Sequence, residues 1–125
     1  NAPRPCPFSH PSSRLLVRRL RSGRLLLVKN GRLNQGYERN QMIAYVSEDD
    51  GKSWKGGLVL DARKNVSYPD ADQAADGTIF AVWDRERMSE HEILLTRFTE
   101  ADVMLGGTHA MPMIVSKGGR DEQGE

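Results

Sequence analysis

The sequence predicts an all-β protein made of two successive four-stranded antiparallel units. Three observations support this prediction: short runs rich in β-branched, aromatic and leucine residues recur along the chain, glycine-containing turns separate them, and the whole pattern repeats once. Ser22-Gly23 and Asp76-Gly77 mark the repeat, since each turn follows the first run of its unit, at an offset of 54 residues.

The first unit is predicted over residues 14–62. A Ser-Gly pair between two runs of Leu and Val is typical of a β-hairpin, although the first run also fits a short amphipathic helix. A polar loop then leads to the third strand, and a sharp turn leads to the fourth. The four predicted strands are residues 14–21, 24–29, 41–47 and 55–60.

The second unit is predicted over residues 63–116. Its strands are expected at residues 70–75, 78–84, 92–98 and 111–116, the last of them at a sheet edge. Thr99 precedes Glu100-Ala101-Asp102 and is expected to cap a short helix that reaches about Met104 and ends at Gly106-Gly107.

The two ends of the chain differ from these units. Residues 1–13 contain four prolines, which disfavour both helix and sheet pairing, so an extended connector is predicted there. Residues 117–125 are polar and include three glycines, which predicts a flexible tail. Because the chain opens at Asn1 rather than Met, we expect a fragment or a processed product.

Charge and composition exclude several classes of function. The chain has 18 basic and 17 acidic residues, so no overall field attracts nucleic acid, and the cluster Arg18, Arg19, Arg21 and Arg24 lacks interleaved aromatic residues for base stacking. No apolar run is long enough to span a bilayer, and the first residues do not resemble a signal peptide. Cys6 is the single cysteine and the three histidines are scattered, so neither a metal site nor a cofactor is predicted.

The turn between the third and fourth strands follows the pattern Ser-x-Asp-x-Gly-x-x-Trp. Ser47 opens it, the carboxylate of Asp49 can accept backbone N–H groups, Gly51 can adopt a positive φ, and Trp54 carries a large apolar surface under the turn. These residues are predicted to maintain the fold. Replacing Trp54 with Ala is expected to destabilise the fold by roughly 3–5 kcal/mol, as for truncation of a large buried aromatic residue.

This octet is similar to the Asp box that recurs in the blades of sialidase-like β-propellers. Residues 37–46, just before it, resemble the segment in which sialidases place the last of three arginines that bind the substrate carboxylate. Residues 66–70, 76–84 and 92–99 resemble the closing blade, which begins at the nucleophilic tyrosine. The resemblance covers roughly residues 14–103 and is to the C-terminal part of a six-bladed propeller.

The resemblance implies that Tyr68 is the nucleophile and Arg39 a carboxylate clamp. A neutral phenol approaches an anomeric carbon that carries a carboxylate without like-charge repulsion, and a guanidinium meets a carboxylate with two parallel hydrogen bonds. In the family a Glu activates the tyrosine and an Asp is the acid/base group. Both are expected upstream of Asn1, so this chain alone is expected to be inactive.

Two further residues follow from position. At an offset of 54, Arg14 is equivalent to Tyr68, so both are expected at the mouth of a central channel. Asp70 lies two residues after Tyr68 and is expected to point to the same face and to bind a sugar hydroxyl or a basic partner. The alternatives are a packed tyrosine, an Asx turn and solvated arginines. Pro69 also replaces the serine usual in the family, which leaves the substrate class open.

The leading interpretation is the C-terminal part of a sialidase-like exo-glycosidase that acts on a sialoside or another acidic glycan. The alternative is a non-catalytic carbohydrate-binding or assembly propeller. Since two blades cannot close a ring, their unpaired edges predict self-association or further chain. The resemblance favours a secreted or periplasmic location.

Overall fold

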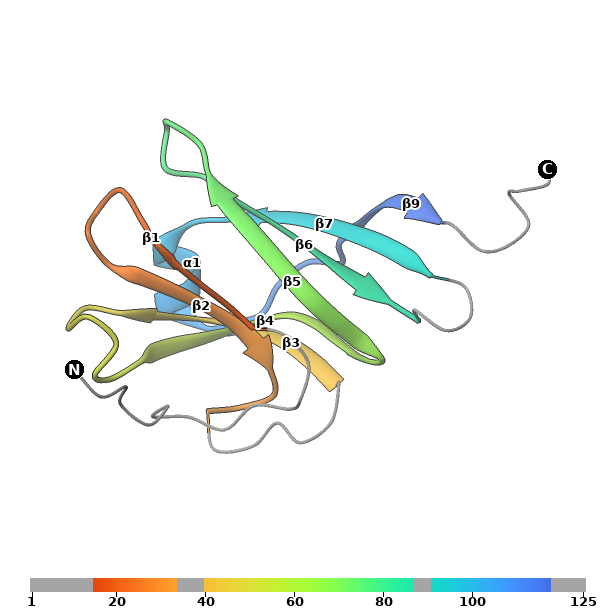
Figure 1. Ribbon diagram of the computed structural model, residues 1–125, viewed down its shortest axis with the longest axis horizontal. Coiled ribbons are helices and arrows are strands. Elements are labelled where there is room, and N and C mark those ends of the chain that lie inside the picture. The colour runs from red at the N-terminus through yellow and green to blue at the C-terminus, as the bar shows by residue number, and fades with distance from the viewer. Residues whose placement is uncertain (1–14, 34–39, 87–90, 118–125) are drawn as a thin grey trace, which may run out of the picture.

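The chain forms two β-sheets that lie against one another, as shown in Figure 1 for the computed structural model. The structure describes residues 15–33, 40–86 and 91–117. The strand order is β1-β2-β3-β4-β8 in the first sheet and β5-β6-β7-β9 in the second. The predicted all-β class is therefore confirmed, and the two sheets are consistent with adjacent propeller blades.

The first sheet is built mainly from neighbours in sequence. Its four principal strands are β1 (Leu16–Arg19), β2 (Leu25–Asn30), β3 (Asn40–Ser47) and β4 (Lys55–Lys64). They pair antiparallel in chain order. A two-residue strand, β8 (Gly107–Thr108), adds to β4 in parallel, so this sheet has five strands rather than the predicted four.

The second sheet has the four antiparallel strands that the sequence predicts. They are β5 (Val66–Gln73), β6 (Ile79–Arg85), β7 (Glu92–Phe98) and β9 (Met113–Lys117). The edge strand predicted near residues 111–116 is thus confirmed, as β9 pairs with β7. Pro69 has no register partner in β6, because the pairing shifts between Ser67 and Asp70, and β5 is the opposite edge of the sheet, so its missing N–H costs no ladder bond.

The predicted repeat is visible in the hydrogen bonds of the two hairpins. In the first turn Leu20 N donates to Arg24 O at 2.7 Å and Gly23 N donates to Leu20 O at 2.9 Å. In the second turn the same two bonds join Ala74 to Thr78 and Gly77 to Ala74, at 2.8 and 3.0 Å, each 54 residues further on. The two units therefore share their hairpin geometry as well as their sequence pattern.

A short helix, α1 (Glu100–Leu105), links β7 to β8. The predicted cap is present: Asp102 N donates to Thr99 Oγ1 at 3.1 Å, and Thr99 N donates to Asp102 Oδ2 at 2.9 Å. Val103 points into the core, and its carbonyl lies so close to Gly56 of β4 that a Cβ there would overlap it. The helix is thereby held against β4 of the first sheet.

The main core lies between the two sheets. It takes alternate residues from each, so that leucines and valines of β1, β2 and β4 meet Ile79, Trp83 and Leu94 of the second sheet. A smaller cluster on the other face of the first sheet contains Leu27, Ile43, Tyr45 and Val59, with Trp54 packed against it. Trp54 is only partly buried, in contrast to the expectation, because it covers an outer face.

Candidate functional site

Four strands begin and four end at one end of the molecule. β1, β3, β5 and β7 start there, and β2, β4, β6 and β9 finish there (Figure 1). Positive φ angles concentrate at the same end. Six non-glycine residues among those described have them: Gln41, Asp50, Asn65, Tyr68, Glu86 and His91. All but Asp50, which lies in the turn after β3, flank or occupy these strand ends.

Tyr68 is the clearest case of local strain. It is the third residue of β5, is partly buried and has a φ of 56°. The pairing of β5 with β6 shifts between Ser67 and Asp70, so Tyr68 occupies an irregular part of the strand. A bulky residue in the left-handed region costs of the order of 1–3 kcal/mol, and such residues persist mainly where function requires them.

Asn30, the last residue of β2, joins the starts of β3 and β5. Its side chain is buried, and Nδ2 lies 2.9 Å from Val66 O, 3.2 Å from Gln41 O and 3.5 Å from Asn40 O. The two strand starts are therefore fixed relative to one another by one amide. The sequence analysis missed Asn30; the available signal was the polar pair Lys29-Asn30, which follows the apolar run 25–28.

The segment after β2 is shaped by a fully buried lysine. Lys29 Nζ donates to the carbonyl oxygens of Asn30, Gly31 and Arg32, at 2.7, 3.2 and 2.7 Å. Tyr45 Oη also donates to Gly31 O at 3.2 Å. The three bonds from Lys29 Nζ compensate for the burial of its ammonium group, as a buried charge requires. They fix the direction in which the chain leaves β2.

A polar cluster begins where β4 approaches β5. The Trp83 indole donates to Asp61 Oδ2 at 2.9 Å, and Arg63 meets both oxygens of Asp61 at 2.9 Å each. Burial alone raises the pKa of the Asp61 carboxyl, but the hydrogen bonds from Arg63 and Trp83 outweigh it and hold the pKa below its ordinary value. Asp61 is therefore a buried carboxylate that links the two sheets.

The polar cluster continues across the end of the second sheet. Arg85 Nη1 donates to the nearly buried Glu92 at 3.0 Å, while Arg85 Nε is buried without a hydrogen-bond partner in the described part of the chain. His91 Nε2 lies 3.8 Å from Asp84 Oδ2. Asp84 pairs in register with Ser67, the residue before Tyr68. Charged groups of both signs thus surround the start of β5.

The predicted site residues have different outcomes. Arg14 and Arg39 lie outside the described residues, although Asn40, which follows Arg39, begins β3 beside the start of β5. Asp70 is exposed, and Arg18 Nη2 of β1 lies 3.4 Å from its Oδ1. The register shift between Ser67 and Asp70 interrupts the regular alternation on which the expected common face of Tyr68 and Asp70 depended.

The turn over residues 47–54 is closed by its own side chains. Ser53 donates to Asp49 from its backbone N at 2.8 Å and from Oγ at 2.6 Å, and Gly51 N donates to Ser47 Oγ at 2.8 Å. The Ser53 side-chain bond, followed by the Ser53 backbone bond, lowers the pKa of Asp49 to about 2. Gly51 has a φ of 90°, which a glycine adopts without strain.

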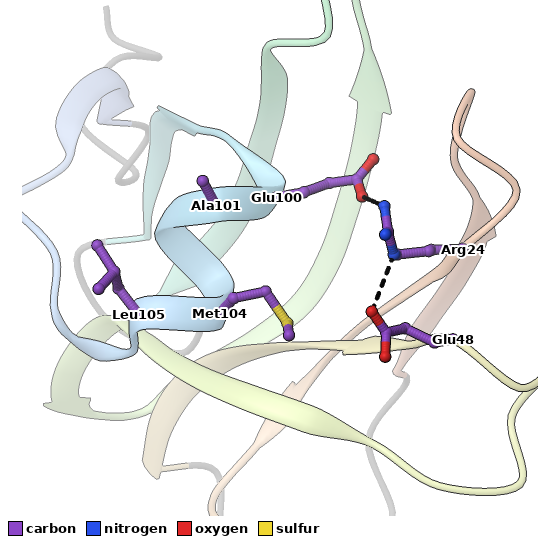
Figure 2. Close-up of a pocket in the computed structure, with 6 residues that line it drawn as sticks. All are labelled: Arg24, Glu48, Glu100, Ala101, Met104 and Leu105. Atoms are coloured by element: carbon purple, nitrogen blue, oxygen red, sulfur yellow. Dashed lines mark hydrogen bonds and ion pairs between the residues drawn. The ribbon is translucent and has the colours of Figure 1, made fainter.

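A polar pocket lies at the opposite end of the sheets, beside α1. Figure 2 shows Arg24 between Glu48 and Glu100, with Met104 and Leu105 at the edge of the hollow. Arg24 Nη1 is 3.0 Å from Glu100 and Arg24 Nε is 3.3 Å from Glu48. Lys55 Nζ also lies 2.7 Å from Glu48 Oε1, so two cations balance the two carboxylates and little charge is left uncompensated for a ligand.

No group of three or more His, Cys, Asp or Glu side chains in the described part of the chain is arranged to hold a metal ion. No helix within it has the length and apolar character needed to cross a membrane.

Two adjacent sheets, one of five strands and one of four, each begin with a hairpin closed at a glycine. This arrangement defines a repeat-built, propeller-like β-protein. The model of the BNR repeat-like domain matches residues 1–81 of the 125-residue chain. The chain therefore belongs to the BNR repeat-like domain family. Searches of curated proteins and of solved structures returned no match.

Proposed function

We propose that this chain forms part of a sialidase-like exo-glycosidase that removes terminal acidic sugars. BNR-like repeats are related to sialidase-like and other carbohydrate-related propellers, which supports the class of ligand. The observation that carries the proposal is the strained φ of 56° at Tyr68, among charged groups and at the end where β3 and β5 begin. Strain of this kind is typical of catalytic residues.

In the proposed reaction, a general base, in the family a Glu, takes the phenol proton while the phenol oxygen of Tyr68 attacks the anomeric carbon. The glycosidic C–O bond breaks, and an acid group donates a proton to the leaving oxygen. Water then attacks the same carbon and gives a proton to the conjugate base of that acid group, the bond to Tyr68 breaks, and the phenolate regains its proton from the general base, so the configuration is retained. Arg39, which directly precedes β3, and Arg14 would bind the substrate carboxylate.

The experiment is hydrolysis of a fluorogenic sialoside by the full-length protein that contains this chain. Tyr68→Phe removes the attacking oxygen and should lower kcat by at least about a thousandfold. Tyr45→Phe is the matched control, because it removes a hydroxyl whose partner is Gly31 O, at 3.2 Å. Equal activity of the Tyr68→Phe variant and the wild type would overturn the proposal.

The second candidate is a non-catalytic carbohydrate-binding propeller. The exposed Asp70–Arg18 pair favours it, since both side chains can hydrogen-bond to a sugar without any reaction at Tyr68. Sialoside binding with no hydrolysis in the full-length protein would identify this candidate.

A further inference from the structure

The buried amide of Asn30 connects the two strands that begin beside the proposed nucleophile and the proposed carboxylate clamp. Asn30 is the last residue of β2 and is 1% exposed. Its amide nitrogen carries two hydrogens. One is directed at Val66 O of β5, at 2.9 Å, and the other at β3, where Gln41 O lies at 3.2 Å and Asn40 O at 3.5 Å. This link from β2 to β3 and β5, the Asn30 bridge, joins the first sheet to the second.

Each end of the Asn30 bridge lies close in sequence to a proposed site residue. Tyr68 follows Val66 by two residues, which span at most about 7 Å of chain. Arg39 directly precedes Asn40. The amide hydrogens are directed at backbone carbonyl groups, so Asn30 acts on both residues through their strands rather than by contact with a substrate.

The Asn30 bridge also holds two strained backbones. Gln41 and Tyr68 have φ angles of 60° and 56°, in the left-handed region that non-glycine residues rarely adopt. Gln41 O accepts hydrogen bonds from Asn30 Nδ2 and from Gly31 N, the latter at 3.1 Å. Strained residues persist only where their surroundings over-determine the conformation. The amide of Asn30 supplies part of that constraint on both strands.

The sequence repeat indicates that the fold does not itself require an amide at this position. At the offset of 54 residues that relates the two hairpins, Asn30 corresponds to Asp84 in β6. Asp84 lies 3.8 Å from His91 Nε2, and a carboxylate accepts hydrogen bonds but cannot donate them to a carbonyl group. Of the two units, only the first has the donor, where β3 follows Arg39 and the neighbouring β5 carries Tyr68.

We propose that Asn30 is a positioning residue for the reaction at Tyr68. The Asn30 bridge fixes the separation of Tyr68 and Arg39, so that a sugar whose carboxylate is bound by Arg39 presents its anomeric carbon to the phenol oxygen. This inference rests on the proposed function. Displacement of a reacting group by about 1 Å lowers a rate by about a hundredfold. Loss of the bridge therefore acts on kcat more than on substrate binding.

The kinetic test compares variants of the full-length protein that contains this chain, with a fluorogenic sialoside as substrate. Asn30→Ser keeps one short donor and Asn30→Ala keeps none. The value of kcat per folded molecule should fall in that order, by about a hundredfold for Asn30→Ala, while KM changes less than about threefold. Ser47→Ala is the matched control, because Ser47 is a buried polar residue at the opposite end of β3 and accepts Gly51 N at 2.8 Å. It should lose stability and keep its kcat.

Hydrogen exchange followed by mass spectrometry gives a second measurement, which needs no hydrolysis. In Asn30→Ala, the peptides that contain residues 40–42 and 66–68 should both exchange faster than in the wild type. In Ser47→Ala, faster exchange should be confined to the turn at residues 47–53, because Asp49 N and Gly51 N lose their acceptor. Asn30→Ser gives the same comparison where Asn30→Ala does not fold. Unchanged exchange in either of the two peptides would overturn the bridge.

Three kinetic results would overturn the positioning role. They are a kcat of Asn30→Ala within about threefold of the wild type, a loss carried by KM alone, and an equal fall in kcat per folded molecule for Ser47→Ala. A wild type that hydrolyses no sialoside, or that Tyr68→Phe does not impair, would overturn the proposed function and the positioning role with it. A wild type impaired by Tyr68→Phe but not by Asn30→Ala would overturn the positioning role alone. The two failures are therefore distinguishable.

Discussion

The hydrogen bond between Trp83 and Asp61 should make a measurable contribution to the packing of the two sheets. The indole nitrogen donates to Asp61 Oδ2 at 2.9 Å, and Trp83 is 1% exposed. A hydrogen bond to a charged group contributes about 2 kcal/mol. Trp83→Phe also removes ring carbons from the core, which costs roughly a further 1 kcal/mol. The expected loss in the free energy of unfolding is therefore about 3 kcal/mol.

Urea unfolding of a double-mutant cycle separates the two contributions. Trp83→Phe, Asp61→Ala and the double variant should show a coupling energy of at least about 1 kcal/mol, because the bond exists only when both the indole N–H and an acceptor at position 61 are present. Trp54→Phe is a useful comparison, since Trp54 is partly exposed and should lose less. Additive effects, within about 0.5 kcal/mol, would show that the bond does not stabilise the interface.

Three other predictions concern the backbone and pH. Gly56→Ala should lower the free energy of unfolding in urea several times more than Gly77→Ala. A Cβ at position 56 would overlap the Val103 carbonyl, whereas nothing lies within 4 Å of a Cβ at position 77. Similar losses would contradict this. Asp49 has a pKa of about 2 in the fold, below its ordinary 3.8, so the stability that it gives above pH 4 should fall as pH drops from about 4 to 2. In thermal melts over that range Asp49→Asn should show a weaker pH dependence, and an unchanged profile would refute the assignment. Tyr68→Gly should be more stable than Tyr68→Ala by about 1 kcal/mol, the reverse of the usual order in strands, because glycine accepts a positive φ; the usual order would mean that Tyr68 is unstrained.

Local sequence signals were sufficient for most of the fold. The hairpins at Gly23 and Gly77 and the helix cap at Thr99 depend on residues a few positions apart, and each is present in the structure. The parallel pairing of β8 with β4 was not predicted, because two residues carry no periodicity and the pairing depends on how α1 packs. Trp54 was expected to be buried but is only partly so. The turn motif does not reveal which face of the sheet the indole covers.

The candidate site was less accessible to sequence analysis. Tyr68 was found through a resemblance, whereas its left-handed backbone was not, since a bulky aromatic residue is among the least expected at a positive φ. Asn30 and Asp61 act through partners 36 and 22 residues away, Val66 and Trp83, and no local pattern specifies such partners. The roles proposed for Arg14 and Arg39 remain predictions.

Mass spectrometry of the full-length protein, quenched rapidly during turnover of a sialoside and digested, tests the role of Tyr68 most directly. We predict that the peptide containing Tyr68 gains the mass of one sugar residue and that fragmentation places this mass on the phenol. An adduct on another residue, or steady turnover with no adduct on Tyr68 at any quench time, would contradict a tyrosine nucleophile.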